Sequence, residues 1–112
     1  MDKNEQELNK TIEIMNMRDI KPTQLFDVRV DRMSIFGNPF PETKTEDRNI
    51  VCDKYETYFH NRLGDDKEFQ MGMKIMIKLY NKHKRLRLFC WCTPLRCHAE
   101  TIKRWLIKEL GR

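Results

Sequence analysis

No stretch of this chain approaches the roughly 20 consecutive apolar residues needed to span a bilayer, so we expect no membrane-spanning helix and no membrane partner. The segment from Met1 to Glu7 has neither the basic start nor the apolar stretch of a secretory signal peptide. Internal repeats and low-complexity tracts are also lacking. Together these absences favour a cytoplasmic protein that folds as a single domain.

The composition of the 112 residues is polar but still typical of a folded protein. Hydrophobic residues make up 39% of the chain and charged residues 35%, and aromatic residues, Ile, Leu and Met recur at regular spacings. A chain of this length is expected to form one core. We predict an α/β domain over residues 21–112, preceded by a peripheral helical extension over residues 1–20.

Basic residues gather in the C-terminal part of the chain. Residues 82–112 contain nine Lys or Arg and two Glu, a net charge of +7, which leaves −2 for the rest of a chain whose total is +5. Such a segment favours an anionic partner, for example a nucleotide, another phosphorylated ligand or a nucleic acid. A solvated basic surface without a partner is the alternative.

Four segments carry helical patterns, with apolar residues recurring every three to four positions. In the first segment these residues are Leu8, Ile12 and Met15. In the second, Thr45 is suited to cap the start of the helix and Gly64 to end it. The predicted helices are Lys3–Met17, Glu46–Leu63, Asp66–Lys82 and Ala99–Leu110.

Two segments are predicted to be strands. Apolar and charged residues alternate in Leu25–Arg32, the pattern of a half-buried strand, and Leu86–Trp91 is apolar apart from one arginine, as in a buried strand. Strands separated by helices favour a small α/β fold with a short, mostly parallel sheet flanked by helices. A third strand is expected near Ile20–Gln24 or after Phe40.

The loops that follow the two strands contain the candidate binding residues. The carboxyl ends of parallel strands meet at one edge of a sheet, so the Gly37–Phe40 loop and the Cys90–His98 loop are expected to face each other across a crevice. Arginine suits a phosphate, Asn38 can read a base edge or a sugar, and Trp91 can stack on a base. The candidate ligand-binding residues are Arg32, Ser34, Gly37, Asn38, Trp91 and Arg96.

Cys97 and His98 are the candidate catalytic residues. They fall at the predicted start of the last helix, where the positive end of the helix dipole lowers the pKa of a thiol and attracts anions. The neighbouring Arg96 adds to this field, and His98 is suited to act as acid, base or hydrogen-bond donor.

A zinc site is an alternative for the same loop. Cys90, Cys92, Cys97 and His98 offer four ligands of the kinds that zinc takes in tetrahedral sites. Their spacing argues against zinc, because structural zinc sites usually combine a C-x₂₋₄-C pair with a distant second pair. We therefore favour no cofactor, with zinc as the possible exception.

A purely structural interpretation also remains open. In it the small cysteines pack the end of the strand, Pro94 shapes the turn, His98 caps the last helix and Trp91 is a core side chain. Cys52, which is distant in sequence and lies in a predicted helix, is expected to be structural in every interpretation.

The two loops together resemble a small bacterial and phage family known as domain of unknown function 4326. The resemblance rests on the run from Arg32 to Phe40, which contains Gly-Asn-Pro-Phe, and on Cys-Trp-Cys-x-Pro-Leu-x-Cys-His from Cys90 to His98. Phe36 stands where the family usually has Trp, and Ala99 where it often has Gly. The resemblance implies a compact α/β fold and a bacterial or viral origin, without an established reaction.

Three functional hypotheses follow. The first is a phage or bacterial accessory protein that binds, with or without processing, a nucleotide-like or phosphorylated ligand in the crevice. The second is a phage protein without enzymatic activity that binds a host protein or sequesters a signalling nucleotide in the host cytoplasm. The third is a zinc-stabilised module that binds nucleic acid.

Overall fold

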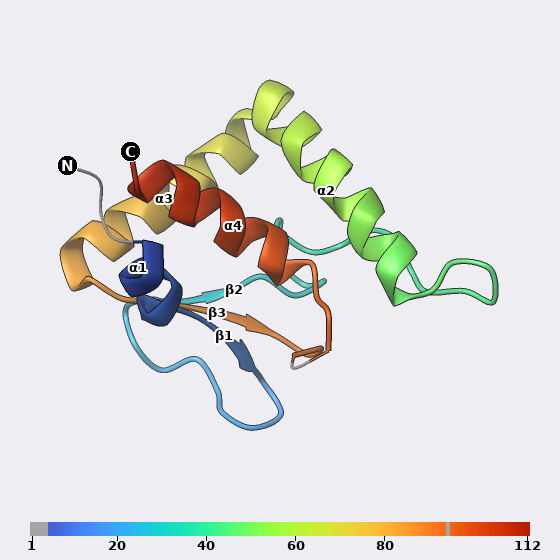
Figure 1. Cartoon of the computed structure of the whole chain (residues 1–112), viewed down its shortest axis with the longest axis horizontal. Coiled ribbons are helices and arrows are strands. Elements are labelled where there is room, and N and C mark those ends of the chain that lie inside the picture. Colours follow the sequence, from blue (N-terminus) through green and yellow to red (C-terminus); the bar gives the residue numbers. More distant parts are fainter. Residues whose placement is uncertain (1–4, 94) are drawn as a thin grey trace.

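The computed structural model describes residues 5–93 and 95–112 and contains a small α/β fold (Figure 1). The start of the first predicted helix at Lys3 and the turn at Pro94 lie outside the described residues. No described helix is long and apolar enough to cross a membrane. The elements in chain order are α1 (Glu5–Thr11), β1 (Ile12–Asn16), β2 (Asp27–Arg29), α2 (Arg48–Asp65), α3 (Lys67–His83), β3 (Leu86–Cys90) and α4 (Ala99–Leu110).

The three described strands form one parallel sheet in the order β1-β3-β2. The four described helices lie on the same side of this sheet in Figure 1, and the loop between β1 and β2 lies on the other side. The helix-facing side of β3 contributes Leu86, Leu88 and Cys90 to the main hydrophobic core. The predicted α/β class with a short parallel sheet is therefore confirmed.

The prediction for the N-terminal segment is wrong from Ile12 onward. The helix ends at Thr11, and Ile12–Asn16 is a strand that pairs with β3 instead of the second half of a peripheral helix. Ile12 and Ile14 alternate with polar or flexible residues, and β-branched residues favour strands, so this pattern competes with the helical one. The third strand thus lies in neither of the two places where it was expected.

Other predicted boundaries shift by a few residues. β2 is confined to Asp27–Arg29 within the longer predicted strand. Asp47, and not Thr45, caps α2, because its side chain accepts a hydrogen bond from the amide of Ile50. The helix continues through Gly64 and ends where the Asp66 side chain caps the next helix.

Phe36 anchors the loop between β2 and α2 in the core. Its ring lies edge-on to Phe69, with 5.5 Å between the ring centroids. A Cβ atom on Gly72 of α3 would come within 2.5 Å of the Phe36 ring, so the glycine makes room for this aromatic side chain. Tyr55 holds the same loop by donating a hydrogen bond of 2.7 Å to the carbonyl of Phe36.

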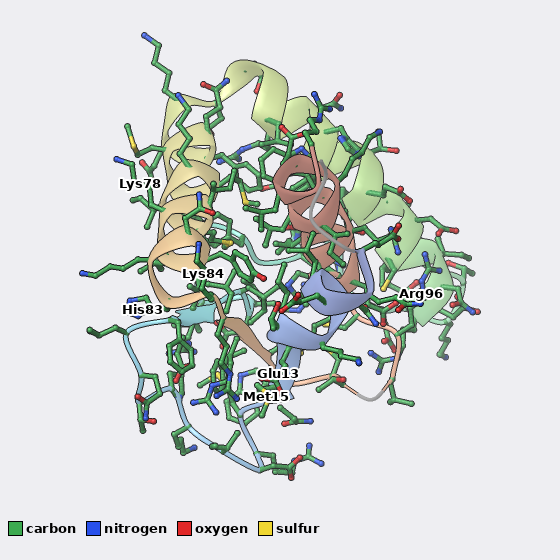
Figure 2. The ribbon with its side chains drawn as sticks, turned by 60° about the vertical axis from the view of Figure 1, so that its left-hand side comes forward. Glu13, Met15, Lys78, His83, Lys84 and Arg96 are labelled. Atoms are coloured by element: carbon green, nitrogen blue, oxygen red, sulfur yellow. The ribbon has the colours of Figure 1, made fainter. Side chains whose placement is uncertain are left out.

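The side of the sheet without helices is built around a buried ion pair. Arg87 of β3 donates hydrogen bonds of 2.6 and 2.7 Å to the carboxylate of Asp27 on β2, and both side chains are almost inaccessible to solvent. The Arg87 guanidinium also lies over the rings of Phe26 and Phe89. Glu13 of β1 lies on this same side (Figure 2).

Candidate functional site

A cavity of about 210 Å³ lies beyond the carboxyl ends of the strands, where the loops after β2 and β3 meet the start of α2. The sequence predicted that the Gly37–Phe40 loop and the Cys90–His98 loop lie close together, and this arrangement agrees with that prediction. The cavity is lined by Asp31, Arg32, Met33, Asn38, Glu42, Arg48, Val51, Cys52, Trp91, Cys92, Arg96, Cys97 and His98.

His98 lies at the back of the cavity in a fixed orientation. Its Nε2 is hydrogen-bonded to the carbonyl of Val30, which can only accept, so Nε2 carries the proton. Its Nδ1 then presents a lone pair to the Sγ of Cys97, 3.6 Å away. The ring lies edge-on to Tyr55 at a centroid distance of 4.9 Å. Burial lowers the pKa of His98, which favours the neutral ring that this arrangement requires.

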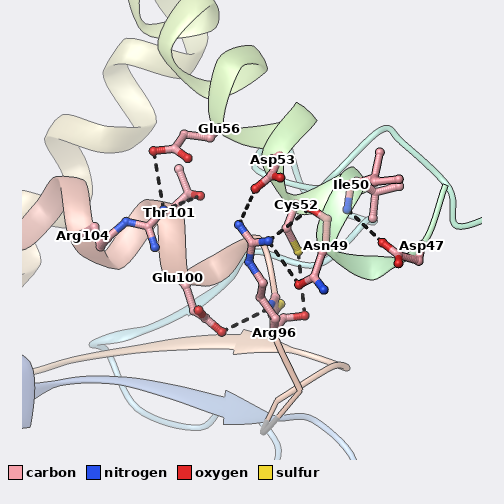
Figure 3. Close-up of polar contacts among 12 residues, drawn as sticks. Asp47, Asn49, Ile50, Cys52, Asp53, Glu56, Arg96, Glu100, Thr101 and Arg104 are labelled. Atoms are coloured by element: carbon pink, nitrogen blue, oxygen red, sulfur yellow. Dashed lines mark hydrogen bonds and ion pairs between the residues drawn. The ribbon is translucent and has the colours of Figure 1, made fainter.

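His98 therefore lies inward and makes no capping hydrogen bond to α4, contrary to one role that the structural interpretation gave it. Glu100 in the first turn of α4 instead accepts a hydrogen bond of 3.2 Å through its carboxylate from the amide of Cys97, which precedes the N-cap residue (Figure 3). A carboxylate from the protein itself thus already occupies part of the anion-binding end of the helix. This arrangement weakens the expectation that the start of α4 holds a phosphate.

Three of the four cysteines form a cluster at the cavity. Cys97 lies beside both Cys90 and Cys92, and its single S–H proton can be donated to either thiolate or to Nδ1 of His98. A hydrogen bond from Cys97 to the thiolate lowers the pKa of Cys92 to about 6 and that of Cys90 to about 7. Arg48 adds to the effect on Cys92 through a hydrogen bond and its charge. The pKa of Cys97 is raised, because its hydrogen bonds with Cys90 and Cys92 require its thiol to keep the proton, and burial acts in the same direction. Cys92 is half-buried, whereas Cys90 and Cys97 are buried.

Three arginines contribute positive charge to the cavity. Arg48 forms an ion pair of 3.2 Å with Glu42, and both side chains are partly exposed. Arg96 donates hydrogen bonds to the side chains of Asp53 and Asn49 on α2, and the carboxylate of Asp53 partly neutralises its charge (Figure 3). Arg32 donates hydrogen bonds to backbone carbonyls of its own loop. The Arg48 guanidinium also donates a hydrogen bond to the carbonyl of Arg96 and is hydrogen-bonded to Cys92. Its carboxylate partner Glu42 is about half exposed, so this ion pair can be exchanged for one with a ligand.

Trp91 lies at the mouth of the cavity with about half of its side chain exposed. Its Nε1 donates a hydrogen bond of 3.0 Å to the carboxylate of Asp31, which is itself buried and paired with Arg29. The Nζ of Lys21 lies 5.7 Å from the centre of the Trp91 ring. The ring is thus fixed in orientation and still partly open to solvent, unlike a core tryptophan.

Asn38, Ser34 and Gly37 hold the loop in shape. Asn38 is buried, donates to the carbonyl of Val51 and accepts from the amide of Phe40, although it also lines the cavity. The hydroxyl of Ser34 donates to the carbonyl of Asp31. Ser34 and Gly37 are not among the residues that line the cavity. Direct ligand contact by these two residues therefore receives no support from the geometry.

The close approach of the backbone of Asp31 and Arg32 requires a glycine at position 37. A Cβ atom at this position would lie 2.6 Å from both the Cα of Arg32 and the carbonyl oxygen of Asp31. We expect Gly37→Ala to lower the free energy of unfolding by about 1–3 kcal/mol, the usual cost of overpacking. Gly64→Ala is the matched control, because a Cβ there meets nothing within 4 Å and should stabilise α2 by up to about 1 kcal/mol. Urea unfolding of both variants measures the difference, and equal changes would contradict this explanation.

Sequence reasoning missed Arg48, Asp31 and Glu42 as cavity residues. Arg48 is the first residue of α2, so its place beside the Cys90–His98 loop depends on packing between segments far apart in sequence. Asp31 could have been suspected, because it directly precedes Arg32 at the end of the predicted strand. Cys52, predicted to be purely structural, is buried on α2 but also lines the cavity.

Zinc binding by Cys90, Cys92, Cys97 and His98 stays the alternative that the sequence left open. Among the described residues, no group of three or more Cys, His, Asp or Glu has an arrangement suited to a metal ion. In addition, both ring nitrogens of His98 already have partners in the protein. Native mass spectrometry of freshly purified protein would reveal bound zinc directly.

Comparison with models of protein families matches residues 15–108 to a family described as a domain of unknown function, DUF4326. The match covers most of the chain, so the protein belongs to this family, as the two loops had indicated. Comparisons with curated proteins and with solved structures gave no match.

Proposed function

We propose that the protein binds a nucleotide-like or otherwise phosphorylated ligand in the cavity at the carboxyl ends of its strands. The observation that supports this most is the meeting of Arg48, Arg32 and the half-exposed Trp91 at one cavity. Guanidinium groups suit phosphate oxygens, and an exposed indole suits a base. The cavity also lies at the carboxyl ends of the strands, which is where parallel sheets commonly bind ligands.

The size of the cavity indicates how such a ligand would bind. A volume of about 210 Å³ is smaller than the roughly 300 Å³ at which pockets begin to enclose a whole drug-sized molecule. We therefore assign the phosphorylated end to the interior beside Arg48 and the base to the exposed face of Trp91. The carboxylate of Glu42, now paired with Arg48, occupies the position that a phosphate oxygen would take.

The Cys97–His98 pair is the candidate for any chemistry on the ligand. His98 presents its lone pair to Cys97, so it is suited to accept a proton from this thiol. A protein that only sequesters the nucleotide would use the same cavity without this step. Analysis of the ligand after long incubation distinguishes the two, because processing yields a new compound and sequestration returns the ligand unchanged.

Fluorescence titration tests the binding proposal. Trp105→Phe leaves Trp91 as the single tryptophan, and AMP, adenosine and inorganic phosphate serve as probes. We expect AMP to change the emission of Trp91 at lower concentration than adenosine, and phosphate to compete with AMP. Equal responses to AMP and adenosine, or no response to any probe, would remove the proposal.

Two variants of the Arg48–Glu42 pair should shift the affinity in opposite directions. Arg48→Gln removes a charge-assisted hydrogen bond, which is usually worth about 1.5–3 kcal/mol, and so should weaken AMP binding by roughly 10-fold or more. Glu42→Gln removes the competing carboxylate and should tighten binding. Arg104→Gln is the matched control, since this arginine pairs with Glu56 and does not line the cavity.

A further inference from the structure

The cysteine cluster combines three features that favour thiol oxidation. Cys92 is more accessible to solvent than the other three cysteines. It also lines the cavity, which gives a small oxidant a route to its sulfur. Cys97 lines the same cavity and lies close enough to Cys92 to lower the pKa of its thiol. The guanidinium of Arg48 is hydrogen-bonded to Cys92 and stabilises its thiolate form.

We propose that Cys92 and Cys97 are a redox-active pair: a peroxide oxidises Cys92, and Cys97 then closes a disulfide with it. The proposal does not depend on the identity of the ligand in the cavity. It assigns to Cys92 the role of the attacking thiolate and to Cys97 that of the resolving thiol. Cys90 and Cys52 take no part.

The first step transfers oxygen from the peroxide. The thiolate of Cys92 attacks one oxygen of hydrogen peroxide, the O–O bond breaks, and the leaving hydroxide takes up from the solvent the proton that the thiol had released, which gives water. The sulfur of Cys92 is thereby oxidised by two electrons to a sulfenic acid, and the peroxide is reduced.

The second step forms the disulfide with the help of His98. The sulfur of Cys97 attacks the sulfur of the Cys92 sulfenic acid while its proton passes to Nδ1 of His98, 3.6 Å away. The S–O bond breaks, and the departing hydroxide leaves as water after taking that proton back from the imidazolium. The Val30 carbonyl on Nε2 keeps the lone pair of Nδ1 directed at Cys97 throughout.

Burial explains why the other two cysteines are excluded. Cys90 is 0% exposed at the end of β3 and is not among the residues that line the cavity. Cys52 is 4% exposed, contacts the carbonyl of Arg96, and has a pKa raised by burial. Cys52 therefore contains little thiolate at neutral pH and reacts slowly with peroxide. Cys90, whose pKa is lowered, is excluded because its sulfur is shielded from solvent and from the cavity.

Peptide mapping after peroxide treatment tests the proposal on the full chain. Trypsin separates the cysteines into three peptides: residues 49–54 with Cys52, residues 88–96 with Cys90 and Cys92, and residues 97–103 with Cys97. We expect hydrogen peroxide to link the second and third peptides through Cys92, with fragmentation excluding Cys90. The link should form at least about tenfold faster than the thiol of Cys52 is lost, and dithiothreitol should reverse it.

A variant separates the two steps. In Cys97→Ser the reaction should stop at the sulfenic acid, which dimedone traps on Cys92, and circular dichroism shows whether the variant is folded. If it does not fold, the cross-link in the wild-type chain still decides the matter. The proposal is overturned if the wild-type peptides stay unlinked, if the link passes through Cys90 or Cys52, or if it joins two chains.

Discussion

Arg87→Met is expected to lower the free energy of unfolding by about 3–5 kcal/mol, the usual cost of removing one partner of a buried ion pair. The variant leaves the carboxylate of Asp27, whose side chain is 1% exposed, without the guanidinium that now donates two hydrogen bonds to it. Methionine keeps most of the apolar contact with the rings of Phe26 and Phe89, so the loss reflects the unpaired charge. Urea unfolding followed by circular dichroism measures it.

A double variant provides the control for this loss. Asp27→Asn combined with Arg87→Met removes both charges and keeps a side-chain oxygen that can accept from the amides of Thr23 and Gln24, as Asp27 does now. Because replacing a buried ion pair as a whole is often neutral, we expect the double variant to be more stable than Arg87→Met alone. A double variant that is less stable than the single one would show that the charge is not the cause.

The rate of alkylation of Cys92 by iodoacetamide should reach half its maximum near pH 6, because the surroundings lower the pKa of this thiol to about 6. Only the thiolate reacts, so the rate should rise as the pH increases through 6 and then level off. The hydrogen bond from Cys97 and the charge of Arg48 both stabilise the thiolate of Cys92, so the pKa of this thiol is lowered. Mass spectrometry of the tryptic peptides follows each cysteine separately.

Arg48→Gln should move this midpoint to higher pH, because it removes a positive charge beside the thiolate. Arg104→Gln removes the same charge elsewhere on the surface and should leave the midpoint in place. A midpoint near 9 in the wild-type protein would mean that the thiolate of Cys92 is not stabilised. It would also weaken the redox proposal, although peroxide mapping tests that proposal separately.

The class of fold could be predicted because local patterns dominate most of the chain. The long helices α2 and α3 and the buried strand β3 lie close to their expected places, because apolar residues recur at helical spacing in the helices and form a nearly continuous run in the strand. β1 was missed because Leu8 and Ile12 have helical spacing while Ile12 and Ile14 have strand spacing. Only pairing with β3, a contact between distant segments, decides between them.

The site could be predicted in outline but not in its details. The parallel-sheet rule brought the two loops together correctly, since it depends only on strand direction. The roles of single residues depend on contacts that the sequence does not specify. A side chain at Gly37 would clash with the backbone of Asp31 and Arg32. Glu100 accepts a hydrogen bond from the amide of Cys97 just before α4. Arg48 lines the cavity from the start of α2, a position that depends on how distant segments pack.

The central position of β3 has a consequence for how the chain acquires its structure during synthesis. β1 and β2 each pair with β3, which lies between them and is the last strand to leave the ribosome. The sheet and the cavity beyond it therefore cannot assemble until residues 86–98 are available, and α4 follows directly. Shortened chains that end before Leu86 should accumulate as helical but sheetless species and be targets for chaperones and proteases.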